Sequence, residues 1–373
     1  MNRVGITFLL VFIVATGPFL QGCESRIESG ASTLPLDSTS PGAPSSPGAS
    51  IRSEAPRELR PILRLGIDSQ NTEQLLYRPK GVVMDAENRI FILDNDNGRI
   101  AVYSADGQFL RGIGRAGPGP GEFEGSPNVL DGLALDGDFL VAFEGPTRRV
   151  QVFRTDGTYV SSFAKRLGLS SIAIAGERIY TSTAGQTGTD ARIEVFSLSG
   201  DLVKEFGEGG VGEAETAREA RRINRSLIAV APTSGEVGRV YQYTPILRIY
   251  GRDGSLESET AVELRDPPQS QGDPPGVSLS ERTLRALVAR DIEYVVATDL
   301  WVVLLAGGVI RAYAGEGLEV AGEVSLLKPE GHVDAEDSMA AAALDIGVSP
   351  AGDMVCTTVA VEHEVWCYEL QWE

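Results

Sequence analysis

The side chains that could support catalysis are few in this sequence. Histidine, the most versatile general base and a common zinc ligand, occurs only twice, as His332 and His363, in different expected loops. A zinc site built from several histidines is therefore excluded. The patterns of a serine nucleophile elbow (GxSxG), a zinc protease (HExxH) and a phosphate-binding loop (GxxxxGK[ST]) are also absent. The residues themselves predict no catalytic site, no metal site and no cofactor.

The acidic run Asp94-Asn95-Asp96-Asn97-Gly98 resembles a calcium loop only in composition. An EF-hand loop needs glycine at its sixth position and glutamate at its twelfth. Here Gly98 is the fifth residue and Ala105 is the twelfth. A solvated turn is the better interpretation. The glycine-rich segment Gly117 to Gly121 lacks the lysine of a phosphate loop, and we interpret it as a connection between structural units.

Cys356 and Cys367 lie on either side of an expected hairpin near the end of the chain. If the turn is centred between Val361 and Glu362, the two cysteines face each other across paired strands, so a disulfide is geometrically feasible. Two buried thiols in adjacent strands are the alternative. If Cys23 carries a lipid, two cysteines remain in the chain. An even number of cysteines suits an oxidising compartment.

The elements that position these residues are short strands. Gly81 to Met84, Arg89 to Leu93 and Arg99 to Tyr103 are apolar runs rich in Val, Ile, Phe and Tyr, and Gln108 to Ile113 follows as a fourth. Asn97-Gly98 predicts a tight hairpin whose central residues have positive φ. The stretch therefore predicts one antiparallel unit of four strands.

This unit recurs along the chain. Its signature is an aliphatic residue, any residue, a second aliphatic residue and an aromatic, usually followed by a turn that contains glycine. The six aromatic residues are Tyr103, Phe153, Phe196, Tyr250, Tyr313 and Tyr368. The last follows the first by 265 residues in five steps, a mean of about 53 residues per unit, which approximates the period of a four-stranded propeller blade.

The repetition favours an all-β, six-bladed β-propeller over an ordinary sandwich, because radial repetition places the same strand and turn cassette in every unit. The last copy stops after its third strand, near Glu373. Leu59 to Gly66 resembles the fourth strand of the first unit. We therefore expect this N-terminal segment to complete the last blade and close the ring.

One family resemblance is specific enough to state. It rests on Pro79, Gly81, Asp85, Ile90, Phe91, Asp94, Asn97, Arg99, Ile100 and Tyr103, followed by the Gly-Pro-rich Gly114 to Phe123. These residues resemble an NHL repeat, and the wider chain is similar to the TolB-like six-bladed propeller lipoproteins of bacteria. A second unit, Asp131 to Gly157, matches partly, and the others match only in strand pattern. The resemblance implies a binding or scaffolding module.

The resemblance also suggests a catalytic alternative. Lactonases of the senescence-marker and paraoxonase type are six-bladed and hold Ca²⁺ at the channel mouth with Glu, Asn and Asp. Asn128, Asp131 and Glu144 are the residues of those types near the expected mouth. Their spacing is not diagnostic. A calcium-dependent, lactonase-like hydrolase is therefore the second functional hypothesis.

The N-terminal region has the pattern of a lipoprotein signal. Arg3 precedes a short apolar core, and Leu20-Gln21-Gly22-Cys23 resembles a lipobox, so residues 1–22 would be removed and Cys23 would carry the lipid. Glu24 follows the cysteine, which by analogy favours the outer membrane. A transmembrane anchor is the alternative, although the apolar run is short and contains Gly17-Pro18.

Two further regions are distinguished by composition. Residues 23–56 are dominated by Ser, Pro, Gly and Ala, which predicts a disordered tether before a propeller at 57–373. The net charge of −19 argues against binding to nucleic acid or to anionic lipid headgroups, leaving the membrane attachment to the lipid on Cys23.

Two insertions interrupt the regular spacing. Glu213 to Asn224 has acids at its start and arginines at its end, which predicts a short helix. Ser278 and Glu281 form a capping-box pattern that predicts another, after the proline-rich Asp266 to Gly276. Such loops are candidate partner contacts.

The expected ligand-binding surface is the propeller face that carries the connections between blades. It collects a set of mainly cationic residues: Arg78, Lys80, Asp131, Arg148, Arg149, Arg222 and Tyr243. Arginine grips carboxylate and phosphate oxygens in pairs. We therefore expect a non-catalytic envelope scaffold that binds an envelope protein or a small anionic ligand. Pairing of each cation with a local carboxylate is the alternative.

Overall fold

The computed structural model describes residues 57–67, 72–124, 130–165, 168–184, 191–207, 210–211, 214–263, 288–327, 343–359 and 363–372. The chain divides into two units, Met1–Ser53 and Glu54–Glu373. All described residues belong to the second unit. The expected signal peptide, Cys23 and the whole of the expected tether lie outside the described residues. No helix in the described part of the chain is both long enough and apolar enough to span a membrane.

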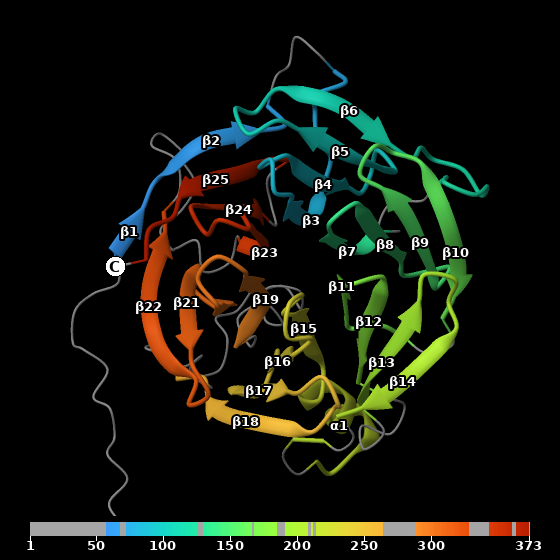
Figure 1. Ribbon diagram of the computed structural model, residues 1–373. Coiled ribbons are helices and arrows are strands. Elements are labelled where there is room, and N and C mark those ends of the chain that lie inside the picture. The colour runs from blue at the N-terminus through green and yellow to red at the C-terminus, as the bar shows by residue number, and fades with distance from the viewer. Residues whose placement is uncertain are drawn as a thin grey trace, which may run out of the picture. The chain divides into compact units, whose positions relative to one another are not determined.

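The described residues of the second unit form a six-bladed β-propeller, as the sequence predicted (Figure 1). Each blade contains four antiparallel strands, counted outward from the channel, and blade 5 has one additional strand. Blades 1 to 3 consist of β3 (Pro79–Met84), β4 (Ile90–Asp94), β5 (Arg99–Tyr103), β6 (Phe109–Ile113); β7 (Leu130–Asp136), β8 (Phe139–Glu144), β9 (Arg149–Arg154), β10 (Tyr159–Ala164); and β11 (Ser171–Ala175), β12 (Arg178–Thr183), β13 (Arg192–Ser197), β14 (Leu202–Phe206).

Blades 4 to 6 repeat the arrangement. Their strands are β15 (Ser226–Val230), β16 (Val237–Tyr241), β17 (Ile246–Tyr250), β18 (Leu256–Ala261); β19 (Ala289–Val295), β20 (Leu300–Leu305), β21 (Val309–Ala314), β22 (Glu319–Leu326); and β23 (Ala343–Val348), β24 (Met354–Val359), β25 (Val365–Glu369), with β2 (Pro61–Leu65) outermost.

The six signature aromatics all lie in third strands, from Tyr103 on β5 to Tyr368 on β25. Beside each of them the pairing with the outermost strand shifts register. Such bulges twist an edge strand and discourage it from pairing with other chains. The repeated signature therefore marks both the core of a blade and the irregularity of its outer edge.

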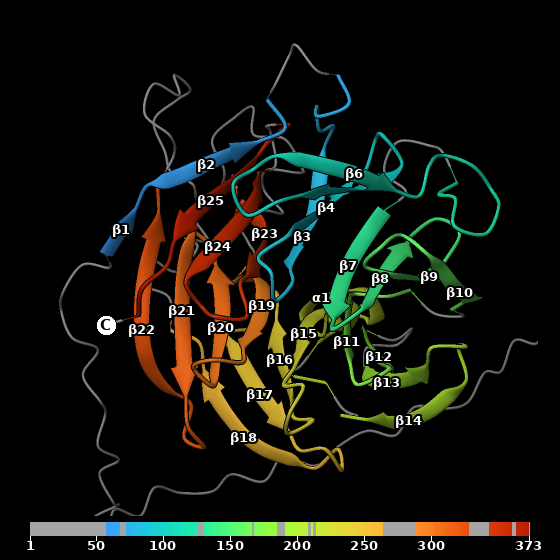
Figure 2. The ribbon, with the colours of Figure 1, turned by 45° about the horizontal axis from the view of Figure 1, so that its top comes forward.

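The N-terminal segment closes the ring as predicted, and it also does more. β2 pairs antiparallel with β25 and supplies the fourth strand of blade 6. β1 (Arg57–Leu59) pairs parallel with β22 and adds a fifth strand to blade 5, which the sequence did not reveal. Figure 2 shows the two strands passing from the outside of blade 5 to the outside of blade 6. One short segment thus ties the last two blades together.

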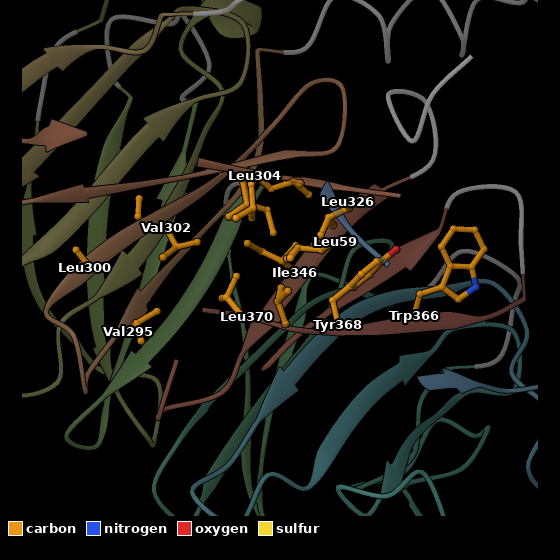
Figure 3. Close-up of a cluster of buried hydrophobic side chains, with 14 of the residues drawn as sticks. Leu59, Val295, Leu300, Val302, Leu304, Leu326, Ile346, Trp366, Tyr368 and Leu370 are labelled. Atoms are coloured by element: carbon orange, nitrogen blue, oxygen red, sulfur yellow. The ribbon is translucent and has the colours of Figure 1, made fainter. Parts of the chain in front are cut away.

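Apolar side chains between the blades form the core. The cluster between blades 5 and 6 includes Leu304 of β20, Ile346 of β23 and Tyr368 of β25 (Figure 3). Leu59 of β1 joins the same cluster and is only 5% exposed. Burial of these side chains stabilises the packing of neighbouring blades, because it removes apolar surface from water.

Three local predictions can be compared with the structure. The helix expected at Glu213 to Asn224 is present but shorter, as α1 (Ala217–Ile223). It begins after Thr216, because the Thr216 hydroxyl caps the first turn by accepting a hydrogen bond from the Glu219 N–H at 3.2 Å. The Asn97-Gly98 hairpin forms, but its loop has four residues between β4 and β5, and Gly98 alone among them has positive φ. The helix expected after Ser278 lies outside the described residues.

Candidate functional site: the central channel

The two ends of the channel are defined by the strand order. At one end, the start face, the innermost strands begin and the turns between second and third strands lie. At the other, the end face, the innermost strands turn into the second strands. Arg78, Lys80, Arg148, Arg149 and Tyr243 belong to the start face by this criterion.

Two of the expected cations are paired with carboxylates. The Arg78 guanidinium donates to both carboxylate oxygens of Asp96, each 2.6 Å away. The Lys80 ammonium lies 2.8 Å from a carboxylate oxygen of Asp131, so these two expected site residues are brought together across blades 1 and 2. Their charges are compensated locally.

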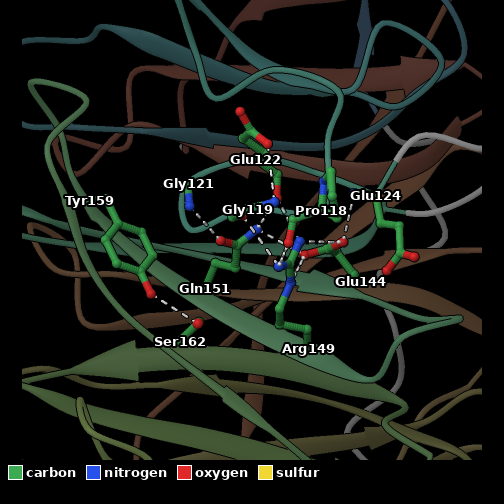
Figure 4. Close-up of polar contacts among 10 residues, drawn as sticks. All are labelled: Pro118, Gly119, Gly121, Glu122, Glu124, Glu144, Arg149, Gln151, Tyr159 and Ser162. Carbon is green, nitrogen blue, oxygen red and sulfur yellow. Dashed lines mark hydrogen bonds and ion pairs between the residues drawn. The ribbon is translucent and has the colours of Figure 1, made fainter.

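Arg149 is held in a network of hydrogen bonds (Figure 4). Its Nε lies 2.7 Å from Oε1 of Glu144, which is fully buried. Its Nη1 and Nη2 donate to carbonyls of the segment that enters blade 2, including Pro118 at 3.1 Å and Glu122 at 2.5 Å. Arg149 therefore fastens this connection to the blade, a structural role that differs from the expected ligand contact.

The same arrangement recurs in other blades. Arg99 donates to the Glu73 and Leu75 carbonyls before blade 1, Arg239 donates to the Gly207 carbonyl before blade 4, and Arg311 donates to the Glu263 carbonyl before blade 5. Arg239 and Arg311 are at most 2% exposed. Arginines of the second and third strands thus donate hydrogen bonds to the backbone of incoming connections.

The remaining expected residues also make local contacts. The Arg222 guanidinium of α1 lies 4.7 Å from the ring centroid of Tyr243, a cation–π geometry that joins these two expected residues. Arg148 has a φ of +55°, and its carbonyl accepts a hydrogen bond from the Lys165 N–H. The structure thus places the expected residues in separate local pairs.

Of the three residues considered for calcium, the two that the structure describes, Asp131 and Glu144, contact other groups of the protein. Asn128 lies outside the described residues, and Asp131 faces Lys80. Both carboxylate oxygens of Glu144 are occupied, Oε1 by Arg149 and Gln151 and Oε2 by the Glu124 N–H. Within the described part of the chain, no group of three or more His, Cys, Asp or Glu residues could hold a metal ion.

The structure joins Cys356 and Cys367 in a disulfide across β24 and β25, with their Cα atoms 4.0 Å apart. Both residues are fully buried. Of the two alternatives for this pair, the structure has the bonded one. The disulfide lies in the blade that the N-terminal segment completes.

A cavity of about 540 Å³ occupies the channel. The innermost strands of all six blades line it, together with the turns of the end face. Its size lies within the range of about 300–1,000 Å³ that is usual for small-molecule sites. The lining is rich in carboxyls: Asp85, Glu87, Asp131, Asp136, Asp138, Asp291, Glu293 and Asp345, with Arg89 and Arg290 as the cations.

Three of these carboxyls, Asp291, Glu293 and Asp345, influence one another in the wall formed by blades 5 and 6. Burial raises the pKa of Asp291 to about 7, although two backbone N–H groups oppose the shift. Burial and the Asp291 charge raise the pKa values of Glu293 and Asp345 well above their ordinary range. Burial also lowers the pKa of Arg290 to about 10. Each of the three carboxyls is therefore harder to ionise than an ordinary carboxyl.

None of these three residues was expected at a functional site from the sequence. Asp291 and Glu293 alternate along β19, and Asp345 on β23 is followed by isoleucine just as Asp291 is. Carboxyls at every second position of an innermost strand share one side of that strand. The repeated Asp-Ile pair was therefore the available signal, but it becomes informative only when the innermost strands are aligned.

Comparisons with known proteins agree with the fold. Residues 70–125 match the profile of the DUF5128 family, which is described as a six-bladed β-propeller. A segment is also similar to the Drosophila melanogaster protein "brain tumor", with 29% identity over 85 residues, or 23% of this chain. That segment spans 8% of the fly protein's length.

Two solved structures resemble the chain at low identity. A streptogramin B lyase has 12% identity and a TM-score of 0.47, with 80% of each chain covered. The hydrazine synthase of Kuenenia stuttgartiensis has 10% identity and a TM-score of 0.49, with 82% of this chain and 99% of the other covered. Similarity at this level carries no information on activity. What the geometry and the DUF5128 match together establish is a six-bladed β-propeller with an acid-lined channel.

Proposed function

We propose that this protein is a non-catalytic binding protein of the bacterial cell envelope, anchored by a lipid on Cys23, and that its propeller binds a small cationic ligand in the central channel. The observation that carries the proposal is the cavity of about 540 Å³ bounded by all six innermost strands. A site of this size and enclosure suits a small molecule.

The chemical class of the ligand is argued from the cavity lining. Carboxyls outnumber cations there, and burial raises the pKa values of Asp291, Glu293 and Asp345, with repulsion from Asp291 adding to the shift of the other two. An amine or other organic cation would supply the missing countercharge in this acidic site. The anionic ligand expected at the start face is less favoured, because Arg78 and Arg149 already contact Asp96 and Glu144.

We also propose that the propeller binds its ligand without catalysing a reaction. The described residues that line the cavity include carboxyls and hydroxyls but no His, Cys or Lys, the side chains that most often activate a nucleophile or act as one. The lactonase-like hydrolase is the second candidate, and it requires Glu144 to exchange Arg149 and Gln151 for a calcium ion. Lactone hydrolysis that depends on added Ca²⁺ would favour it over the binding protein.

Calorimetric titration of the detergent-solubilised full chain tests the ligand class. We use spermidine as the cationic probe and citrate as the anionic one. Spermidine should bind to the wild type. The Glu293→Gln variant should have an affinity for spermidine that is lower by about tenfold or more, because one charge contact of about 1.4 kcal/mol is lost. Glu259→Gln, on the outermost strand β18, is the matched control and should leave binding unchanged. Binding of citrate but not spermidine would refute the cationic site.

The envelope location is tested separately. The motif Leu20-Gln21-Gly22-Cys23 predicts that the mature chain begins at a lipid-modified Cys23. Mass spectrometry of the mature N-terminus should find this group, and Cys23→Ala should release the protein from membranes. An uncleaved Met1 or an unmodified Cys23 thiol contradicts the lipid anchor.

A further inference from the structure

The innermost strands of the six blades can be aligned through their pairing with the signature aromatics. In blade 5, Tyr313 pairs with Trp301 and Trp301 pairs with Tyr294, so Tyr294 marks the level of the aromatic on β19. The same two pairings in the other blades mark Met84, Leu135, Ile174, Val230 and Val348. The six strands that surround the cavity can therefore be compared position by position.

The acidic residues of blades 5 and 6 are exceptions to the repeated pattern. One residue before the marked level β19 has Glu293, where the other strands have Val83, Ala134, Ala173, Ala229 and Gly347. Three residues before it β19 and β23 have Asp291 and Asp345, where the others have Gly81, Gly132, Ser171 and Leu227. The repeat itself thus calls for small or apolar residues at these positions, and the charges are confined to two blades.

Hydrogen bonds show which blade interfaces the acids occupy. Asp291 accepts a hydrogen bond from the Ile346 N–H of blade 6 at 2.8 Å, and Glu293 lies on the same side of β19 because side chains alternate along a strand. Asp345 accepts from the Val82 N–H of blade 1 at 2.9 Å. The three carboxyls therefore lie at the two interfaces beside blade 6. We call this part of the cavity lining the acidic wall.

The lining contributed by blades 3 and 4 is apolar. Its members on β11 and β15 are Ser171, Ile172, Ala173, Ile174, Leu227, Ile228, Ala229 and Val230. Ser171 is the one polar side chain among them, and its hydroxyl accepts a hydrogen bond from the Ile228 N–H at 3.2 Å. The aliphatic members are at most 8% exposed, so packing fixes their positions. We call this part of the lining the apolar wall.

The two walls lie on different sides of one channel. The innermost strands follow one another around the ring in blade order, which puts blade 3 opposite blade 6 (Figure 1). The cavity of about 540 Å³ between them is bounded by both walls. A ligand that fills it therefore meets carboxyls on one side and hydrocarbon on the other.

The other carboxyls of the described lining lie toward the ends of the channel, in blades 1 and 2. Those of blade 1, Asp85 and Glu87, are within ion-pair distance of Arg89. Those of blade 2 are Asp131 at the start face and Asp136 and Asp138 at the end face. They leave the apolar wall without a carboxyl of its own.

We propose that the channel selects an amphiphilic amine, whose single ammonium group contacts the acidic wall and whose hydrocarbon body contacts the apolar wall. This inference rests on the proposed cationic ligand and narrows its chemical class. A second ammonium group at the far end of the ligand would lose its hydration against the apolar wall without gaining a partner, which is unfavourable. A methyl group in the same place is removed from water, which is favourable.

Three probes of equal chain length separate these contributions. Pentylamine has one ammonium and one methyl end, putrescine has an ammonium at each end, and pentanol has no charge. Each is titrated calorimetrically into the detergent-solubilised full chain, and the heat of its addition to detergent alone is subtracted. Pentylamine should bind about tenfold more tightly than putrescine, because only putrescine places a charge against hydrocarbon. It should also bind more tightly than pentanol, which cannot pair with the carboxyls.

Val230→Thr tests the apolar wall directly, because it replaces a methyl group with a hydroxyl of similar size. It should weaken pentylamine about fourfold, the effect of one lost methyl contact, and leave putrescine unchanged. Ile172→Thr on β11 is a second variant of the same wall and should act in the same direction. Val203→Thr is the matched control, since Val203 is 53% exposed on the outermost strand β14. It should leave the binding of both amines unchanged.

The outcomes distinguish this inference from the proposal on which it rests. Putrescine that binds as tightly as pentylamine, or more tightly, overturns the selection for an apolar body and leaves the cationic site in place. Equal losses of both amines in Val230→Thr and Ile172→Thr, or no loss of either, also overturn it. If neither amine binds, or pentanol binds as well as pentylamine, both the cationic ligand and its narrower class are refuted.

Discussion

The carboxyl of Asp345 accepts a hydrogen bond from the Val82 N–H at 2.9 Å, although the two residues are 263 positions apart. This contact joins the innermost strand of the last blade to that of the first. The outer edge of the same blade is closed by β2, which pairs with β25. The ring is therefore closed at both its inner and its outer edge by contacts between the two ends of the propeller.

Leu65→Ala on β2 should destabilise the protein by about 2–5 kcal/mol, because a buried leucine is replaced by a cavity. Leu65 is 2% exposed and packs in the cluster that contains Cys356 and Cys367. Ile62→Ala on the same strand is the control, since Ile62 is 63% exposed and should change the free energy of unfolding by less than about 0.5 kcal/mol. Urea denaturation measures both.

Truncation before Gly66 removes β1 and β2 together. It should lower the melting temperature of the whole propeller, because it uncovers the edges of β25 and β22 at the same time. Differential scanning calorimetry of the shortened and full-length chains makes the comparison. Equal melting temperatures would show that this segment does not hold the ring closed.

Arg149→Ala should cost about 3–5 kcal/mol, because it leaves the fully buried Glu144 carboxylate without its cation. The double variant Glu144→Gln with Arg149→Met should cost less than the sum of the single changes. Arg222→Ala removes an exposed cation–π contact with Tyr243 and should cost less than about 1 kcal/mol. Equal small losses for Arg149 and Arg222 in urea denaturation would contradict the structural role of Arg149.

Loss of the disulfide should reduce stability by roughly 3 kcal/mol, as expected for a short closed loop in the unfolded chain. Cys356 and Cys367 are separated by 11 residues in the sequence. The double variant Cys356→Ala with Cys367→Ala and the reduced wild type should unfold at lower urea than the oxidised wild type. Reductant should not affect the double variant, and an effect there would point to another cause.

Spermidine should bind more tightly as the pH rises. The ligand cation favours ionised carboxyls, so binding releases protons from groups whose pKa values are raised. The association constant should increase by up to about tenfold per pH unit for each proton released, between about pH 6 and pH 8. Calorimetry in buffers of different ionisation enthalpy counts these protons. Binding without proton release would place the ligand away from the cluster.

The sequence alone predicted much of the fold, because its signals are local. The spacing from Tyr103 to Tyr368 and the turns beside each aromatic depend on strands that pair with their immediate neighbours. The missing strand after Tyr368 and the similarity of Leu59 to Gly66 then sufficed to predict the closure of the ring. The helix near Arg222 was also predictable, because charges and a cap act within one turn.

The tertiary structure decided what the charged residues do. The sequence placed Arg149 at the start face, but only the fold shows that the Pro118 and Glu122 carbonyls occupy its guanidinium. Asp291, Glu293 and Asp345 became a cluster only when blades 5 and 6 were placed side by side. The physical reason is that charges interact through space over several ångströms, so their partners and their pKa values depend on burial and on residues that are distant in the chain.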